Sequence, residues 1–226
     1  MREIWEEWGE RGTGLDCERD HSGLAPAFGG GIFCRMINTV ESAPVPLRGA
    51  PLWPLSVAAY RALGEMGLIP KNTELLYGFV YTKISKSPLH SALLRRLKRK
   101  LEQALPPGYF IDSEQPLACE DSEPEPDIAV IRGSEDEFWH QHPGSAELVI
   151  EISISSHDYD RSKLRAYATA GVKECWLVLG PEKQIEVYRQ PRNGQFTDHA
   201  IHGPGGALTS AVLPEFTLGL DGFFAK

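Results

Sequence analysis

Three residues that could perform chemistry together lie within a short part of the chain. They are Asp127 in EPEPDIAV, Glu151 in ELVIEIS and Lys163 in DYDRSKLRAY. Two carboxylates can hold a hard divalent cation such as Mg²⁺, which polarises a phosphate and its attacking water. A lysine stabilises the negative charge that develops during the reaction. The three residue types therefore suit metal-assisted hydrolysis of a phosphodiester.

Glu151 is the most unusual of the three because it lies in an apolar strand. Both faces of ELVIEIS are largely apolar, as in the central strand of a covered sheet. A buried carboxylate is costly unless a cation or a hydrogen-bond donor meets it. One explanation is an ion pair with an arginine or lysine of a neighbouring helix, and the other is a functional site.

Asp127 follows Pro126 at the start of the apolar run 126–132. An aspartate in this place is commonly a turn or capping residue. However, 126–132 and 146–153 are successive apolar segments, which we expect to be neighbouring strands of one sheet. Neighbouring strands can bring Asp127 close to Glu151.

Lys163 is predicted to lie on a helix over about residues 160–170, where it shares a face with Tyr167 and Ala170. Lysines on helices are usually exposed to solvent. The connection SSHDYDR is short, however, and makes it easy for Lys163 to reach Glu151. Asp160 is expected to cap this helix or to lie in its first turn.

His90 and Glu74 are two further candidates. His90 begins a helix predicted over 88–105 and shares a face with Leu97 and Leu101, so it should point towards the sheet. Glu74 enters a strand before a turn near Gly78. Each is either a hydrogen-bonded core residue or part of the site.

The remaining pattern predicts an α/β domain with a mixed sheet. A helix is expected near 54–67, and two short strands within 73–85. Further strands are expected at 109–119, 126–132, 146–153, 175–180, about 181–190 and about 196–201. Residues 1–50 contain a GGG run, several prolines and little periodicity, which indicates a disordered or loosely packed segment. The folded domain is therefore assigned to 51–226, and Met36 is an alternative start of the native protein.

Composition narrows the class of protein. The chain has 226 residues, 42% of them hydrophobic, and a net charge of −8. Its apolar runs are far shorter than a membrane span, and its start lacks the pattern of a secretory signal, so we expect a cytoplasmic protein without a membrane partner. The four scattered cysteines predict neither a disulfide framework nor a zinc site. The basic run LLRRLKRKL is either a solvated helix face or a contact surface for nucleic acid.

Taken together, the segments ELLYGFVYTKIS, SPLHS, EPDIAV, ELVIEIS, DYDRSKLRAYATAGVKECWLV, IEVYR and LPEFTLGL resemble the Uma-two family of restriction endonucleases, within the PD-(D/E)xK nuclease superfamily. The resemblance covers roughly 54–224 and is strongest over 147–189. It implies a restriction-endonuclease-like core, in which a mixed β-sheet is flanked by helices.

The resemblance also implies a site. Glu74, Asp127 and Glu151 would bind Mg²⁺ or Mn²⁺, Lys163 would act on the attacking water, and His90 would assist. The position two after Glu151 is Ser153 and not the usual lysine, so the lysine would be displaced onto the following helix. The expected substrate is DNA, and a homodimer would suit cleavage of both strands. Two other functions stay open, which are a catalytically inactive binding or regulatory module with the same fold and a hydrolase of another phosphate ester.

Overall fold

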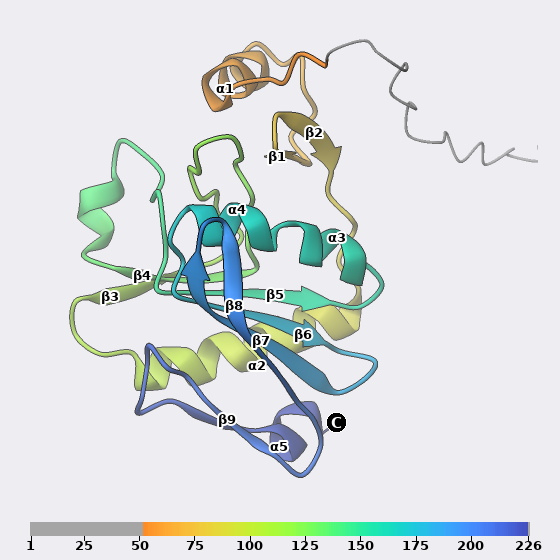
Figure 1. Cartoon of the computed structure of the whole chain (residues 1–226), viewed down its shortest axis with the longest axis vertical. Helices are drawn as coiled ribbons and strands as arrows, with labels where there is room; N and C mark the ends of the chain where they lie inside the picture. The colour runs from red at the N-terminus through yellow and green to blue at the C-terminus, as the bar shows by residue number, and fades with distance from the viewer. Residues whose placement is uncertain (1–51, 226) are drawn as a thin grey trace, which may run out of the picture. The chain divides into compact units, whose positions relative to one another are not determined.

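A six-stranded sheet in the order β3-β4-β5-β6-β7-β8 forms the centre of the fold (Figure 1). β5 and β6 run parallel, and the other neighbouring pairs are antiparallel. The parallel pair requires a crossover, which the segment between β5 and β6 provides. The strands are β3 (Tyr109–Asp112), β4 (Ile128–Arg132), β5 (Leu148–Ser153), β6 (Glu174–Leu179), β7 (Gln184–Arg192) and β8 (Gln195–His202).

This computed structural model describes residues 52–225. The expectation for residues 1–50, and the alternative start at Met36, lie outside the described residues. None of the described helices has the length and apolar character needed to cross a membrane. The cytoplasmic location stays a prediction.

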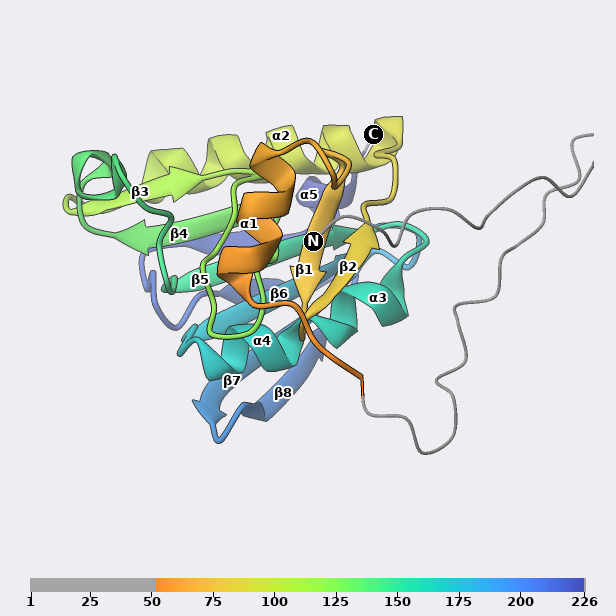
Figure 2. The same ribbon diagram turned by 90° about the horizontal axis from the view of Figure 1, so that it is seen from above.

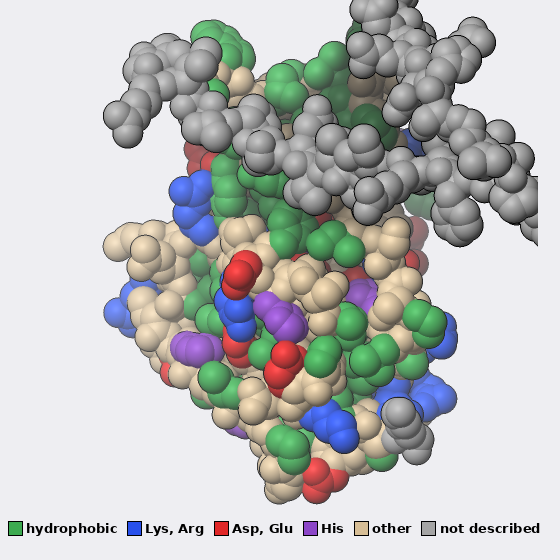
Figure 3. All heavy atoms as spheres, turned by 90° about the vertical axis from the view of Figure 1, so that its right-hand side faces the viewer, with side chains coloured by type: hydrophobic (Ala, Val, Ile, Leu, Met, Phe, Trp, Pro, Cys, Tyr) green, Lys and Arg blue, Asp and Glu red, His purple; other side chains and the backbone are tan. Residues whose placement is uncertain are grey.

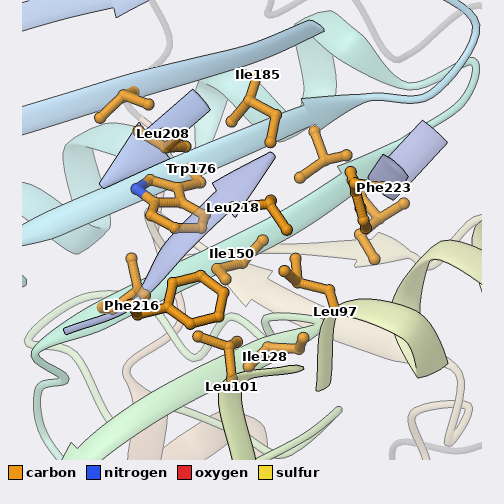
Figure 4. Packing of buried hydrophobic residues seen from close by; sticks show 14 of the residues in the cluster. Leu97, Leu101, Ile128, Ile150, Trp176, Ile185, Leu208, Phe216, Leu218 and Phe223 are labelled. Carbon is orange, nitrogen blue, oxygen red and sulfur yellow. The ribbon is translucent and has the colours of Figure 1, made fainter. Parts of the chain in front are cut away.

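One face of the sheet is covered by α2 (Pro88–Ala104) and the C-terminal part of the chain (Figures 1 and 2). The Ser87 side chain caps α2 by accepting a hydrogen bond from the His90 amide, and Pro88 occupies the first turn. Leu97 of α2 packs on the sheet with Trp176 and Phe223, as Figure 4 shows. The C-terminal elements are β9 (Ala207–Thr209), β10 (Thr217–Gly219) and α5 (Leu220–Phe224).

The opposite face is covered by α3 (His157–Ser162) and α4 (Leu164–Thr169), which form the crossover between β5 and β6. Tyr167 packs there in a second apolar cluster with Val149 and Cys175. Every residue of β5 and β6 is buried. Glu151 on β5 is therefore enclosed by the two layers of helices.

A small unit lies on the α3 and α4 side of the sheet (Figure 1). It consists of α1 (Val57–Glu65) and the hairpin of β1 (Thr73–Leu76) and β2 (Phe79–Thr82). β1 is buried along its whole length, whereas β2 is exposed. A bridge between Leu75 and Glu123 joins the hairpin to the acidic loop before β4. The hairpin thus carries Glu74 to the end of β4 where Asp127 lies.

The predicted mixed sheet with flanking helices is confirmed, and so is the pairing of the segments that contain Asp127 and Glu151. Two expectations were wrong in detail, and some short elements were not expected. The strand at 109–119 ends at Asp112, because the chain turns at Glu114 with φ 59°. The helix over 160–170 is two short helices that meet at Lys163. The short 3₁₀ helix η1 (Glu135–Phe138) and α5 were not predicted at all.

Candidate active site

A cleft of about 550 Å³ contains all five predicted site residues. β1 contributes Glu74, α2 contributes His90, the chain just before β4 contributes Asp127, β5 contributes Glu151, and the junction of α3 and α4 contributes Lys163. These residues are far apart in the sequence, so the fold and not local sequence brings them together. Each of the five is buried, with relative exposure of 1–7%.

Lys163 lies between two carboxylates. Its ammonium nitrogen is 3.0 Å from Glu74 Oε1 and 3.2 Å from Glu151 Oε1. The Tyr167 hydroxyl donates a second hydrogen bond to Glu151 Oε1, at 2.5 Å. Lys163 and Tyr167 lie one helical turn apart on the face that their spacing predicted, and both side chains reach Glu151.

Burial raises the pKa of Glu151 to about 8. Lys163 opposes this shift, but the negative charges of Asp127, Asp160 and Glu74 support it. Burial would lower the pKa of Lys163, yet the same acidic surroundings outweigh burial and raise it above the ordinary value. The lysine therefore stays charged, and burial, supported by the neighbouring acids, makes Glu151 easier to protonate than an ordinary glutamate.

Asp127 is held in a different way. His90 Nε2 lies 2.9 Å from its Oδ2, and the Ile152 amide donates to the same oxygen at 2.7 Å. Lys86 contacts Oδ1 at 3.0 Å. Burial acts to raise the pKa of Asp127, but His90, Lys86 and the Ile152 amide outweigh it and lower the pKa. Asp127 is thus a carboxylate at neutral pH.

Several residues of the cleft carried no functional signal in the sequence. The Tyr159 hydroxyl donates to Glu74 Oε1 at 2.8 Å, and Lys163 Nζ lies 5.2 Å from the centre of the Tyr159 ring. Tyr159 precedes Lys163 by one helical turn, so its place could have been inferred from the helix. Lys86 lies in an irregular connection, where no spacing rule applies. Asp160, expected to cap the helix or to lie in its first turn, lies in the first turn of α3, where it is buried and accepts a hydrogen bond from Ser156.

The donor types of the cleft fit a hard divalent cation, because carboxylate oxygens are the ligands that Mg²⁺ and Mn²⁺ prefer. Six acidic residues line it with only three lysines, an excess of negative charge that favours a cation: Glu74, Glu114, Glu125, Asp127, Glu151 and Asp160 against Lys83, Lys86 and Lys163. Among residues 52–225, however, no three Asp, Glu, His or Cys side chains are grouped as a ligand set. The cause is visible in the contacts, since Lys163 separates Glu74 from Glu151, and His90 and Lys86 contact Asp127.

Within residues 52–225, the histidines outside the cleft, such as His140 with His142 and His199 with His202, do not form a ligand group either. A larger hollow of about 720 Å³ lies beside α1, between Arg61, Lys71 and Trp139. None of the five predicted site residues lines it. We therefore place the candidate site in the smaller cleft.

Comparison with known proteins agrees with this fold. A family model described as "Uma2: Putative restriction endonuclease" matches residues 68–221. Among solved structures, the chain is similar to one from Anabaena variabilis, described as a "putative nuclease belonging to DUF820", with a TM-score of 0.59 and 18% sequence identity. The match covers 72% of this chain and 96% of that one. At this identity the likeness supports the fold alone. No curated protein matches the chain.

Proposed function

Because the chain belongs to the Uma2 family of restriction-endonuclease-like proteins, we propose that it is a metal-dependent endonuclease that hydrolyses DNA phosphodiester bonds. The observation that carries the proposal is the convergence of Asp127, Glu151 and Lys163 on one cleft. A buried ion pair would need only one acid and the lysine, and an acidic loop would need no lysine, so neither explains why all three side chains meet in the cleft. Family and fold are those of nucleases, and the metal and the DNA substrate are our inference.

In this proposal Asp127 and Glu151 hold the cation, which supplies Lewis-acid activation of the phosphate and its attacking water when bound. Glu74 is the third predicted ligand. In the described arrangement both of its oxygens are engaged, Oε1 by Lys163 and Tyr159 and Oε2 by the amide of Glu125. Glu74 can therefore ligate a cation only by giving up one of these partners, and until then it holds the lysine.

The chain's own residues divide the remaining work. Lys163 stays protonated and stabilises negative charge on the phosphate. Its ion pairs with Glu74 and Glu151 hold the ammonium group in position for this role. His90 bonds to Asp127 and so orients that carboxylate. Release of the Glu151 proton leaves a carboxylate that can meet a cation.

The excess of acids implies an order of binding. A phosphate entering the cleft would meet more carboxylates than lysines, so it is repelled until a cation has bound. Figure 3 shows acidic, basic and histidine side chains interspersed on one face, without a continuous basic surface. DNA would therefore depend on the bound cation, and on the exposed cations of α2, for much of its attraction.

The exposed basic residues of α2 are candidates for contact with DNA. The basic run of α2 includes Arg95, Arg99 and Lys100, which are exposed and make no ion pair among the described residues. They can contact DNA phosphates beyond the mouth of the cleft, since His90 at the start of the same helix lines the cleft.

A homodimer would supply one site for each strand of a duplex. Sedimentation with and without DNA would test this.

A second candidate function is a catalytically inactive module with the nuclease fold. The observation in its favour is that Lys163, Lys86 and His90 already contact the acids that would bind the metal. In such a protein the buried charges would be purely structural. The lysines would then remain in place at any concentration of Mg²⁺.

Plasmid cleavage distinguishes the two functions. The purified protein should nick or cut plasmid DNA with Mg²⁺ or Mn²⁺ and not with EDTA, and Asp127→Asn and Glu151→Gln should abolish the activity. Glu102→Gln is a matched control, because Glu102 is an exposed residue of α2 outside the cleft. Absence of metal-dependent cleavage, or cleavage that both variants retain, would reject the endonuclease.

A further inference from the structure

The lysine of the candidate site lies at a break in a helix. A single helix over 160–170 would have the Ala166 amide donate to the Ser162 carbonyl, four residues earlier. Instead, the Ala166 amide donates to the Tyr77 hydroxyl at 3.1 Å, and that hydroxyl donates to the Ser162 carbonyl. The tyrosine oxygen is thus inserted into the helical hydrogen-bond ladder, a known cause of a kink.

The break is what places Lys163. It is the C-cap of α3 and the N-cap of α4 at once, and its amide donates to Asp160, three residues earlier, as in a tightened last turn. From this position its ammonium reaches both Glu74 and Glu151. Residues one turn further along, such as Tyr167, resume regular helical bonding to the Lys163 carbonyl.

Tyr77 occupies a backbone position that does not favour tyrosine. Tyr77 and Gly78 form the two-residue turn between β1 and β2, with φ of 56° and 80°. Hairpin turns with two positive φ values favour Asn-Gly or Asp-Gly. At Gly78 the constraint is steric as well, because a Cβ there would lie 2.2 Å from Pro54 Cβ. Nothing comparable requires a large aromatic residue at position 77.

The turn is nevertheless firmly held. The Tyr77 amide donates to Ser122 Oγ at 2.9 Å, and the Gly78 amide donates to the Asp121 carbonyl at 3.0 Å. On the other side, the guanidinium of Arg165 lies 3.8 Å from the centre of the Tyr77 ring. The side chain is therefore fixed at both ends, at its backbone by the acidic loop and at its ring by α4.

We propose that Tyr77 is a positioning residue for Lys163: its hydroxyl breaks the helix between α3 and α4 and so directs the lysine into the cleft. The proposal rests on the proposed function for its catalytic meaning, but the positioning itself can be tested without catalysis. It also explains how a lysine on a helix can serve this site, although the strand position two after Glu151 is Ser153 and not a lysine. The β1–β2 hairpin then contributes twice, through Glu74 and through Tyr77.

The test compares Tyr77→Phe with the full-length wild-type protein. Phenylalanine keeps the ring that packs on Arg165 and removes only the inserted oxygen, so the bond between Ala166 and Ser162 can form and carry Lys163 away from its acids. Acylation of lysines by a small reagent, followed residue by residue with mass spectrometry, reports this directly. We expect Lys163 labelling to rise about tenfold, since a buried and paired amine reacts only through local opening.

Tyr60→Phe is the matched control. The Tyr60 hydroxyl also anchors the hairpin, by donating to the Thr73 carbonyl at 3.0 Å, but it does not touch the helix break. Tyr77→Asn is a second variant for the case that phenylalanine disturbs the turn, because asparagine suits the positive φ and is too short to reach Ser162. Both Tyr77 variants should expose Lys163, and Tyr60→Phe should not.

DNA cleavage by the Tyr77 variants is an independent measurement of the same effect. If the wild type cuts DNA, Tyr77→Phe should lower kcat about 10²-fold with little change in KM, the effect of a displaced reacting group. If the wild type cuts nothing, the endonuclease is rejected while the labelling still decides on Tyr77. Unchanged Lys163 labelling in both folded Tyr77 variants, or an equal rise in Tyr60→Phe, would overturn the positioning role.

Discussion

Two buried glutamates on neighbouring strands have very different surroundings in this fold. Glu174 on β6 is 0% exposed and receives hydrogen bonds from a ring of donors: Trp176 Nε1, Arg189 Nε and Nη2, Ser210 Oγ, and the amides of Ala211 and Val212. Glu151 on β5 is 4% exposed and, among the described residues, receives hydrogen bonds from Lys163 and Tyr167 alone, while burial and three neighbouring acids raise its pKa.

The contrast separates a structural carboxylate from a functional one. Glu174 joins β6, β7 and the segment that follows β9, and its donors complete the coordination of both oxygens. A buried charge satisfied in this way stabilises one arrangement of the chain. Glu151 lies in a cleft with an excess of negative charge, which a fold under selection for stability alone would avoid. We infer that the second arrangement is kept for cation binding.

The sharpest way to test this contrast is activity. Glu151→Gln should reduce metal-dependent DNA cleavage by at least about 10³-fold, because it removes a carboxylate that would hold the cation. Asp127→Asn should have the same effect. Plasmid cleavage in Mg²⁺ and Mn²⁺ measures it, with circular dichroism to show that each variant is folded. If Glu151→Gln cleaves as fast as the wild type, the two glutamates do not differ in role.

Stability should show the reverse order. Glu174→Ala leaves Arg189 without its buried partner and should cost about 3–5 kcal/mol in the free energy of unfolding. Glu151→Gln should cost less than about 1 kcal/mol, since Lys163 keeps Glu74 as a partner and one acid is removed from a crowded site. Urea unfolding of both variants gives the comparison. Equal losses would indicate that Glu151 is structural too.

The pH dependence of stability provides a finer distinction. The pKa of Glu151 is about 8 in the folded protein, against its ordinary 4.5, so between these values the folded state holds a proton that the unfolded chain has released. Stability should therefore fall as pH rises from about 4.5 to about 8 and then level off. Subtracting the curve of Glu151→Gln from that of the wild type isolates this contribution. A difference that does not vary with pH would contradict the raised pKa.

The smallest expected effect concerns exposed charge. Replacing Arg95 and Arg99 of α2 by serine should weaken DNA binding at low salt and reduce the slope of log K against log salt by about 0.9 for each DNA phosphate that the variant no longer neutralises. Arg132 and Arg192, also exposed, are controls with the same change of charge. Fluorescence anisotropy at several salt concentrations measures the slope. Equal weakening by both pairs would assign the effect to net charge and not to α2.

Much of the site followed from local pattern. Glu151 in an apolar strand, a short connection and a helix with Lys163 and Tyr167 on one face made it easy to expect that Lys163 meets Glu151. Asp127 joined them because successive apolar strands commonly pair. His90 pointed to the sheet because its helical face was apolar.

What could not be predicted depends on contacts between distant segments. Tyr77 lies 85 residues before Ser162, the residue whose carbonyl it contacts, so the helix pattern over 160–170 gave no sign of the interruption. Three of the donors to Glu174, namely Ser210 Oγ and the amides of Ala211 and Val212, come from a C-terminal segment in which no periodic pattern exists. The early end of the strand expected at 109–119 has a local cause, because the chain turns at Glu114 and the Leu117 amide then donates to the Pro124 carbonyl within the loop.

Calorimetric titration of the metal-free protein with Mn²⁺ tests the central claim most directly. We expect saturable binding that grows stronger from pH 6 to pH 8, as Glu151 loses its proton, and that is absent in Glu151→Gln but unchanged in Glu102→Gln. No binding by the wild type, or equal binding by Glu151→Gln, would contradict the claim that this acid-rich cleft is a cation site.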